Sequence, residues 1–152
     1  MKKISFRPAV AGDLPGIVAM LADDDLGKHR EDLSTPLNKA YVDSFIAIGS
    51  DPNQLLAVVE NENLLLGCLQ LTFVPGLSRL GMLRGQIESV RVAAEHRAEG
   101  LGRMMFEWAI EECRSRGCGL VQLTTDKSRT DALQFYESLG FTASHEGMKL
   151  LL

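Results

Sequence analysis

Residues Glu88 to Phe106 read E-S-V-R-V-A-A-E-H-R-A-E-G-L-G-R-M-M-F, and this stretch decides the fold. It opens as a short strand and closes with apolar residues at helical spacing. Between the two, Arg97 to Arg103 form an R-x-x-G-x-G-R turn with few bulky side chains. The first backbone N–H groups of a helix lack internal partners, and glycine lets a ligand approach them closely. The turn is therefore a candidate anion site.

The setting of this turn favours a ligand over simple packing. The alternative is a plain tight turn in which the glycines only cap and pack, and a bare R-x-x-G-x-G would favour that interpretation. Here the turn follows a strand and opens a helix, which is the context that an anion-binding loop requires. Arg97 and Arg103 can add charge-assisted hydrogen bonds to a phosphate. The turn is neither a Walker A loop nor a dinucleotide fingerprint, because it lacks G-K-S/T and G-x-G-x-x-G.

The pattern on both sides of this stretch predicts one domain, residues 1–152, with element order β-α-α-β-β-β-α-β-α-β-β. Gln86 to Val92 and Leu120 to Thr124 flank a helix, which predicts a parallel pair in an otherwise mostly antiparallel sheet. Phe141 to Ser144 and Met148 to Leu152 are expected to be the closing strands. We therefore expect an α/β (α+β) fold with a mixed seven-stranded sheet.

Composition excludes several classes of function. The chain has 152 residues, of which 45% are hydrophobic, enough for a real core. Its net charge of −4 argues against broad nucleic-acid binding but permits a local cationic patch. No apolar run approaches the roughly 18 residues that cross a membrane, and no signal peptide is evident. Cysteine and histidine spacing suits neither disulfides nor a metal. We expect a cytoplasmic protein without metal, nucleic-acid or membrane partners.

A family resemblance rests on three features: the element order, E-S-V-R-V before R-A-E-G-L-G-R, and A-L-Q-F-Y-E-S-L-G-F near the end. In these the chain resembles the GCN5-related N-acetyltransferase (GNAT) superfamily over essentially its whole length. The resemblance implies acetyl-CoA as co-substrate, bound where the parallel pair splays apart. It also implies a possible homodimer.

The resemblance also implies which residues hold the cofactor. The pantetheine arm would pair with the strand segment Val90, Arg91 and Val92. The pyrophosphate would lie in a cradle made by Arg97, Ala98, Glu99, Gly100, Leu101, Gly102 and Arg103. Arg129 would reach the phosphates or the adenine end of the cofactor, with a solvated surface arginine as an equal alternative.

Acetyl transfer to an amine needs a base for the ammonium, a donor to the carbonyl oxygen and an acid for the leaving thiolate. Glu88 is the candidate base, acting directly or through water. Simple alternation puts it on one face with Val90 and Val92, where desolvation would raise its pKa. The alternative is a carboxylate paired with Arg84 or Arg91.

Tyr136 is the candidate acid, because it matches the tyrosine that relatives direct at the CoA sulfur. The alternative is a half-buried core tyrosine whose hydroxyl is satisfied. The main-chain N–H of Val90 is the candidate donor to the thioester carbonyl. Direct transfer is expected, since no cysteine lies in a good nucleophile setting.

These inferences predict an N-acetyltransferase that acts on a primary amine of a small molecule or peptide. A non-catalytic acetyl-CoA sensor of the same fold and a binder of another nucleotide are the alternatives. The acceptor itself is not identified. The acidic run Asp23 to Asp25 would attract a cationic amine or would simply be solvated. The loop from Thr72 to Gly85 is long enough to form a lid or a dimer contact.

Overall fold

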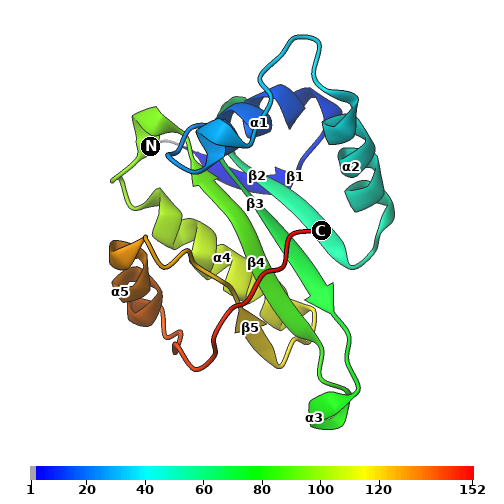
Figure 1. The fold of residues 1–152 in the computed structure, drawn as a ribbon, viewed down its shortest axis with the longest axis vertical. Coiled ribbons are helices and arrows are strands. Elements are labelled where there is room, and N and C mark those ends of the chain that lie inside the picture. Colours follow the sequence, from blue (N-terminus) through cyan, green and yellow to red (C-terminus); the bar gives the residue numbers. More distant parts are fainter. Residues whose placement is uncertain (1–2) are drawn as a thin grey trace.

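The protein, described here by a computed structural model over residues 3–152, contains one open sheet in the order β1-β2-β3-β4-β5. The strands are β1 (Ile4–Pro8), β2 (Gln54–Asn61), β3 (Leu64–Val74), β4 (Arg84–Val92) and β5 (Leu120–Gln122). Neighbours from β1 to β4 are antiparallel, whereas β5 is parallel to β4. The predicted α/β class with a mixed sheet and one parallel pair is confirmed (Figure 1).

The helices cover the two faces of the sheet. They are α1 (Leu14–Ala22), α2 (Lys39–Ser50), α3 (Ser78–Gly81), α4 (Leu101–Ser115) and α5 (Thr130–Ser138). In the view of Figure 1, α4 lies behind β4, while α1 lies on the side facing the reader. Gly117 follows the end of α4 with a φ of 82°, which glycine adopts without strain.

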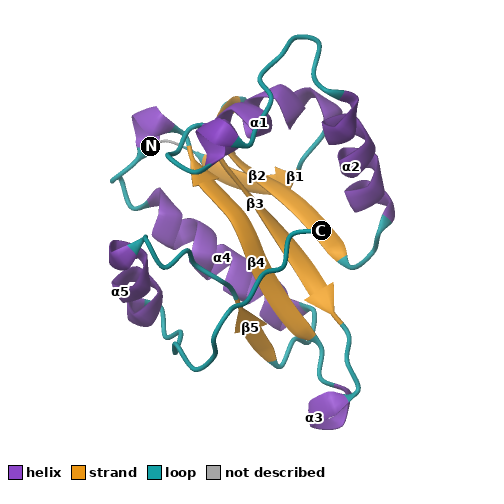
Figure 2. Ribbon diagram, in the orientation of Figure 1, coloured by secondary structure: helices purple, strands orange, loops and turns teal. Residues whose placement is uncertain are grey.

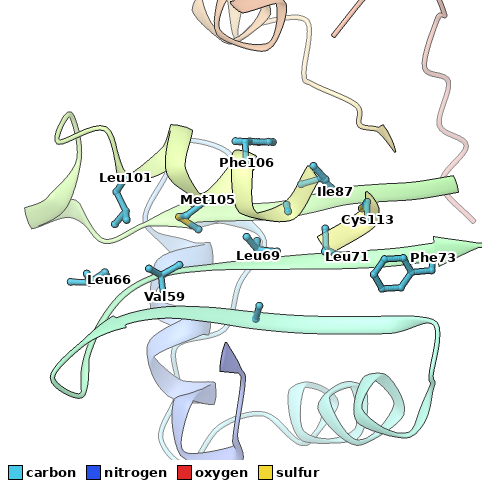
Figure 3. Close-up of a cluster of buried hydrophobic side chains, with 12 residues drawn as sticks. Val59, Leu66, Leu69, Leu71, Phe73, Ile87, Leu101, Met105, Phe106 and Cys113 are labelled. Atoms are coloured by element: carbon cyan, nitrogen blue, oxygen red, sulfur yellow. The ribbon is translucent and has the colours of Figure 1, made fainter. Parts of the chain in front are cut away.

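The main core lies between the sheet and α4. Leu69 and Leu71 of β3 lie in one buried cluster with Met105 and Phe106 of α4, and Phe73 joins the same cluster next to Cys113 (Figure 3). Burying a side chain of this size stabilises the fold by roughly 1.5–3 kcal/mol. The alternate residue Cys68 points to the other face, where it packs with Ile17 of α1. β3 is therefore apolar toward α4 from Leu69 to Phe73, whereas its other face is apolar at Cys68 and polar at Gln70 and Thr72.

The expected closing strands, Phe141 to Ser144 and Met148 to Leu152, do not form. Within residues 3–152 no strand follows β5, so the sheet has five strands instead of seven. Figure 2 shows loop from the end of α5 to the C-terminus. Met148 and Leu150 are 92% and 86% exposed. A strand needs a paired edge, and β5 offers only three residues to pair with.

A β-bulge in β4 corrects one expectation about the site. Glu88 lies opposite Gln70 and Arg91 lies opposite Cys68, so three steps along β4 match two along β3. The extra residue is taken up at Ser89, whose φ of 55° is left-handed. Residues opposite one another share a face, so Glu88 shares its face with Arg91. Simple alternation, which grouped Glu88 with Val90 and Val92, is wrong because the bulge interrupts it.

Candidate active site

A groove opens where β4 and β5 separate. β5 pairs only with Arg84, Gly85 and Gln86, so the rest of β4 has no strand partner on that side among residues 3–152. Beside this edge lies a cavity of about 650 Å³. Its lining residues are Ala22, Asp23, Asp24, Asp25, Lys28, Val90, Arg91, Val92, Arg97 and Arg129. The cavity therefore brings together five expected cofactor contacts from three separate parts of the chain.

Two guanidinium groups cover the carbonyls at this open edge. Arg91 donates to the carbonyl of Val90 at 2.9 Å, and Arg97 donates from Nε to the carbonyl of Val92 at 3.2 Å. Open strand edges carry unpaired backbone groups that need a partner. A ligand that lies along β4 would have to exchange these side-chain donors for its own.

The acidic loop after α1 holds these arginines in place. Asp23 lies 2.8 Å from Arg97, and Asp24 lies 3.1 Å from Arg91 and 3.0 Å from Arg129. Burial opposes ionisation of Asp24, yet the backbone N–H of Gly27 and the two guanidinium groups lower its pKa overall. These carboxylates therefore serve as counter-ions within the groove, and only Asp25 is fully exposed.

Arg129 lies in this groove and pairs with the loop after α1. Its guanidinium meets Asp24 from the start of α5, on the opposite side of the groove from α1. The Nε of Arg91 is buried and has no hydrogen-bond partner among the described residues. A buried unpaired N–H costs free energy, so Arg91, which lines the groove, carries an unsatisfied donor.

The glycine turn has the backbone that an anion cradle requires. Gly100 has a φ of 81° and stands directly before the first residue of α4, Leu101. No side chain caps this helix start. A Cβ added at Gly100 or Gly102 would meet nothing within 4 Å, so the space in front of the amides is open. The turn therefore fits the pyrophosphate that the resemblance implies.

The side chains of the turn do not all face this space. Arg103 donates to Ser138 of α5 at 2.6 Å and lies 3.8 Å from Glu107. Glu99 lies 3.6 Å from His96. The turn therefore offers mainly backbone N–H groups, with Arg97 as the cation nearest β4.

Tyr136 is half-buried on α5, where it packs edge-on against Phe106 and Phe141. Desolvation raises the pKa of the phenol, although Arg129 and Arg91 pull it down. A phenol with a raised pKa is protonated at neutral pH. Tyr136 therefore has the packing of a core tyrosine together with a hydroxyl that is able to donate a hydrogen bond.

Glu88 is exposed, which removes the desolvation expected for a base on this strand. Its carboxylate accepts a long hydrogen bond, 3.4 Å, from the hydroxyl of Thr72. Arg91 pairs with Asp24, and Arg84 reaches Gln122 at 3.5 Å. Within the described residues Glu88 forms neither of the ion pairs offered as its alternative role.

The cysteines do not have the character of nucleophiles. Cys68 and Cys113 are buried, and desolvation raises the pKa of each thiol to about 12. A thiol of this kind stays protonated at neutral pH, and the thiolate is the reactive form. Their surroundings therefore favour transfer without an enzyme-bound acyl group.

Two features escaped the sequence reasoning. The bulge at Ser89 could not be predicted from the sequence, because serine, unlike glycine or asparagine, has no preference for a positive φ. The role of Asp23 and Asp24 as counter-ions had a weak signal in the sequence, since a run of acids in one loop can balance arginines elsewhere.

No group of three or more His, Cys, Asp or Glu side chains within residues 3–152 could hold a metal ion. No helix in the same range combines the length and apolarity needed to span a bilayer.

Comparisons with known proteins agree with this arrangement. A family model described as "Acetyltransferase (GNAT) family" matches residues 20–141. An aminoalkylphosphonate N-acetyltransferase from Salmonella typhimurium is 28% identical over 145 residues, which are 95% of this chain and 89% of the relative. A crystal structure of a transcriptional regulator from Bacillus halodurans C-125 is 48% identical with a TM-score of 0.95, covering 99% of this chain and 100% of that one. A putative acetyltransferase from Agrobacterium tumefaciens is 28% identical with a TM-score of 0.85, covering 97% and 99%.

Proposed function

Since the chain belongs to the GNAT acetyltransferase family, we propose that it transfers an acetyl group from acetyl-CoA directly to a primary amine of a small molecule or peptide. One observation carries this proposal: the open edge of β4 and the uncapped start of α4 adjoin one another. A strand edge suits an extended amide-containing arm, and a helix start suits a diphosphate.

The residues beside the groove support a specific mode of cofactor binding. Val90, Arg91 and Val92 would hold the pantetheine arm through the main chain. The amides of residues 98–103 would hold the pyrophosphate, with Arg97 as counter-ion. Arg129 would add a second cation once its bond to Asp24 is exchanged. Bound there, acetyl-CoA supplies the activated acetyl group.

We assign two of the proton movements in this reaction to two residues. Glu88 takes one proton from the acceptor ammonium, directly or through water, so that the amine nitrogen can form the new C–N bond. The N–H of Val90 donates to the carbonyl oxygen as negative charge develops. The C–S bond breaks, and Tyr136 gives its proton to the departing sulfur. The new amide nitrogen loses its second proton to solvent, and the proton on Glu88 returns to Tyr136 through solvent, so each turnover releases one proton.

Steady-state acetyl transfer, followed by release of free thiol, tests this assignment. We expect Tyr136→Phe to lower kcat about a hundredfold, because the leaving thiolate loses its acid. Tyr41→Phe is the matched control, since the Tyr41 hydroxyl bonds Glu31 and the backbone of Asp32, and none of these residues lines the groove. Glu88→Gln should remove the increase in rate with rising pH that deprotonation of a general base produces. Unchanged rates in both Tyr136→Phe and Glu88→Gln would reject the assignment.

A second candidate is an acetyl-CoA-binding regulatory module, favoured by the 48% identity to a protein described as a transcriptional regulator. Such a module would bind the cofactor without turning it over. Calorimetry with acetyl-CoA, run beside the thiol assay, separates the two: binding without turnover for any amine supports the module.

We further propose a homodimer in the cytoplasm. Exposed apolar side chains at the C-terminus support the dimer, with Leu151 at 94% and Leu152 at 117%. Three free cysteines support a reducing compartment. Light scattering on the purified protein measures the oligomeric state, and a monomer at micromolar concentration would reject the dimer.

A further inference from the structure

Four of the chain's five glutamines converge on one face of the sheet. Gln54 lies opposite Thr72, Thr72 lies opposite Gln86, and Gln86 lies opposite Gln122. This register makes a straight polar row across β2, β3, β4 and β5. Gln70 stands two residues from Thr72 on β3 and so shares the face. We call these residues the glutamine patch: Gln54, Gln70, Thr72, Gln86 and Gln122.

The glutamine patch is a connected network of half-buried side chains. The Oε1 of Gln54 accepts from Gln70 at 3.0 Å and from Thr72 at 2.9 Å. On the other side, the Nε2 of Gln122 donates to the Oε1 of Gln86 at 3.2 Å. These mutual bonds fix the amide orientations. Within residues 3–152 no bond uses Nε2 of Gln54, Oε1 of Gln70 or Nε2 of Gln86, so two donors and one acceptor of these half-buried side chains are left for water or a ligand.

The position of the patch links it to the reaction. Gln70 lies opposite Glu88 in the register, and Thr72 donates to the Glu88 carboxylate at 3.4 Å. The opposite face of the same strands holds the α4 core, including Leu71 and Ile87. The α1 core, with Val58 and Cys68, occupies the other end of the patch's own face. The patch thus forms a polar floor that ends at the candidate base.

We propose that the glutamine patch is the acceptor subsite, and that the acceptor is a primary amine on a hydroxyl-rich scaffold of the amino-sugar class. The inference rests on the proposed acetyl transfer, since it places the amine at Glu88. Hydroxyl groups donate and accept, as amides do, so each free group of the patch finds a complementary partner. The row spans three strand spacings, roughly 14 Å, which suits a ring-bearing ligand lying flat.

The same chemistry disfavours other acceptors. A polycation would find one carboxylate on this floor, Glu88, and a neighbouring cation, Arg84, whose Nη1 lies 3.5 Å from Gln122. An apolar amine would desolvate the amides without replacing their hydrogen bonds, which costs free energy for each group. The discriminating element is therefore neutral hydrogen bonding, with charge confined to the amine end.

Side-chain amide resonances give a direct test that does not require turnover. The chain has five glutamines, so ¹⁵N-labelled protein shows few Nε2 pairs, and Gln134 on α5 serves as an internal control. With CoA present, glucosamine is titrated into one sample and cyclohexylamine into another. Cyclohexylamine is an amine on a ring of the same size without hydroxyls. We expect glucosamine to shift the patch resonances and to leave Gln134 unmoved. Equal shifts with both amines, or none with glucosamine, would overturn the inference.

Kinetics of near-isosteric variants provide the second test. Gln86→Met and Gln122→Met each remove hydrogen-bonding groups at constant volume. We expect roughly a tenfold loss in kcat/KM for glucosamine, because the ligand's hydroxyl is left unpaired. Cyclohexylamine turnover should change little. Gln134→Met is the matched control, because that side chain is exposed on α5. Equal losses for both amines would contradict a specificity role.

The two proposals fail differently. Binding of glucosamine at the patch without thiol release would reject catalysis while leaving the subsite in place. Thiol release with a peptide N-terminus or a polyamine, but not with glucosamine, would reject the amino-sugar subsite while leaving acetyl transfer in place. If glucosamine is turned over while the patch resonances do not shift, the acceptor binds at another site and the proposed subsite is rejected.

Discussion

The two faces of the sheet around β3 and β4 contrast sharply. Toward α4, Leu69 and Leu71 are fully buried in a continuous apolar core. Toward the other side, the neighbouring Gln70 and the exposed Glu88 belong to a polar surface. The same strands thus carry stability on one face and the candidate chemistry on the other. The contrast teaches that a single register decides which residues serve each purpose, and that the bulge at Ser89 sets this register.

Adjacent residues of β3 give the largest expected difference. Leu69→Ala should destabilise the fold by about 2–5 kcal/mol, because it removes buried contacts and leaves a cavity. Gln70→Ala, its neighbour on the opposite face, should cost about 0.5 kcal/mol or a little more, since only one hydrogen bond to Gln54 is lost. Urea unfolding of both variants measures the contrast. Similar midpoints for the two would break it.

The bulge gives the next largest effect. Ser89 has a φ of 55°, which a β-branched side chain resists, so Ser89→Val should destabilise by about 1–3 kcal/mol. Ser89→Gly should be neutral or slightly stabilising, because glycine adopts this conformation freely. Ser5→Val, on the exposed side of β1, is the control for adding a branched residue to a strand. Thermal melts that rank Ser89→Val with Ser5→Val would remove the argument for strain.

The smallest expected effect concerns the ion pairs that cover the polar face. The pKa of Asp24 is lowered in the folded state, so its contribution to stability is present above the ordinary carboxyl pKa of about 3.9 and is lost as the pH falls through the lower folded value. Asp24→Asn should therefore cost about 1 kcal/mol at pH 7 and progressively less below about pH 4.

The neighbouring Asp25 supplies the control for this pH dependence. Its side chain is fully exposed, and it lies 3.3 Å from Lys28. Asp25→Asn should have nearly the same melting temperature as wild type at each pH between 3 and 7. A stability difference between wild type and Asp24→Asn that grows on acidification would contradict the direction of the Asp24 shift.

Much of the fold was readable from local pattern. The turn before α4 was predicted from residue types that have strong backbone preferences. Gly100 illustrates why: only glycine adopts a φ of 81° without strain, so its place in the chain reports the turn directly.

The C-terminal strands could not be predicted correctly, because the alternating pattern of Met148 to Leu152 describes a tendency and not a partner. A strand forms only where another edge accepts its hydrogen bonds, and β5 is too short to provide one. The exposure of Glu88 was missed for a related reason. Its face depends on the register with β3, which two distant segments settle jointly.

The sequence by itself determined the helix-opening turn, the parallel pair and the family, because these depend on residues close together in the chain. Only the tertiary structure decided that Glu88 shares a face with Arg91, that Asp24 joins Arg91 to Arg129, and that four glutamines meet on one surface. For Glu88 and Arg91 the physical reason is that one inserted residue at Ser89 reverses the sense of the side chains that follow it on β4, and for the other contacts it is that segments far apart in the chain must first be brought together. Such a reversal costs little locally, so it leaves no local trace.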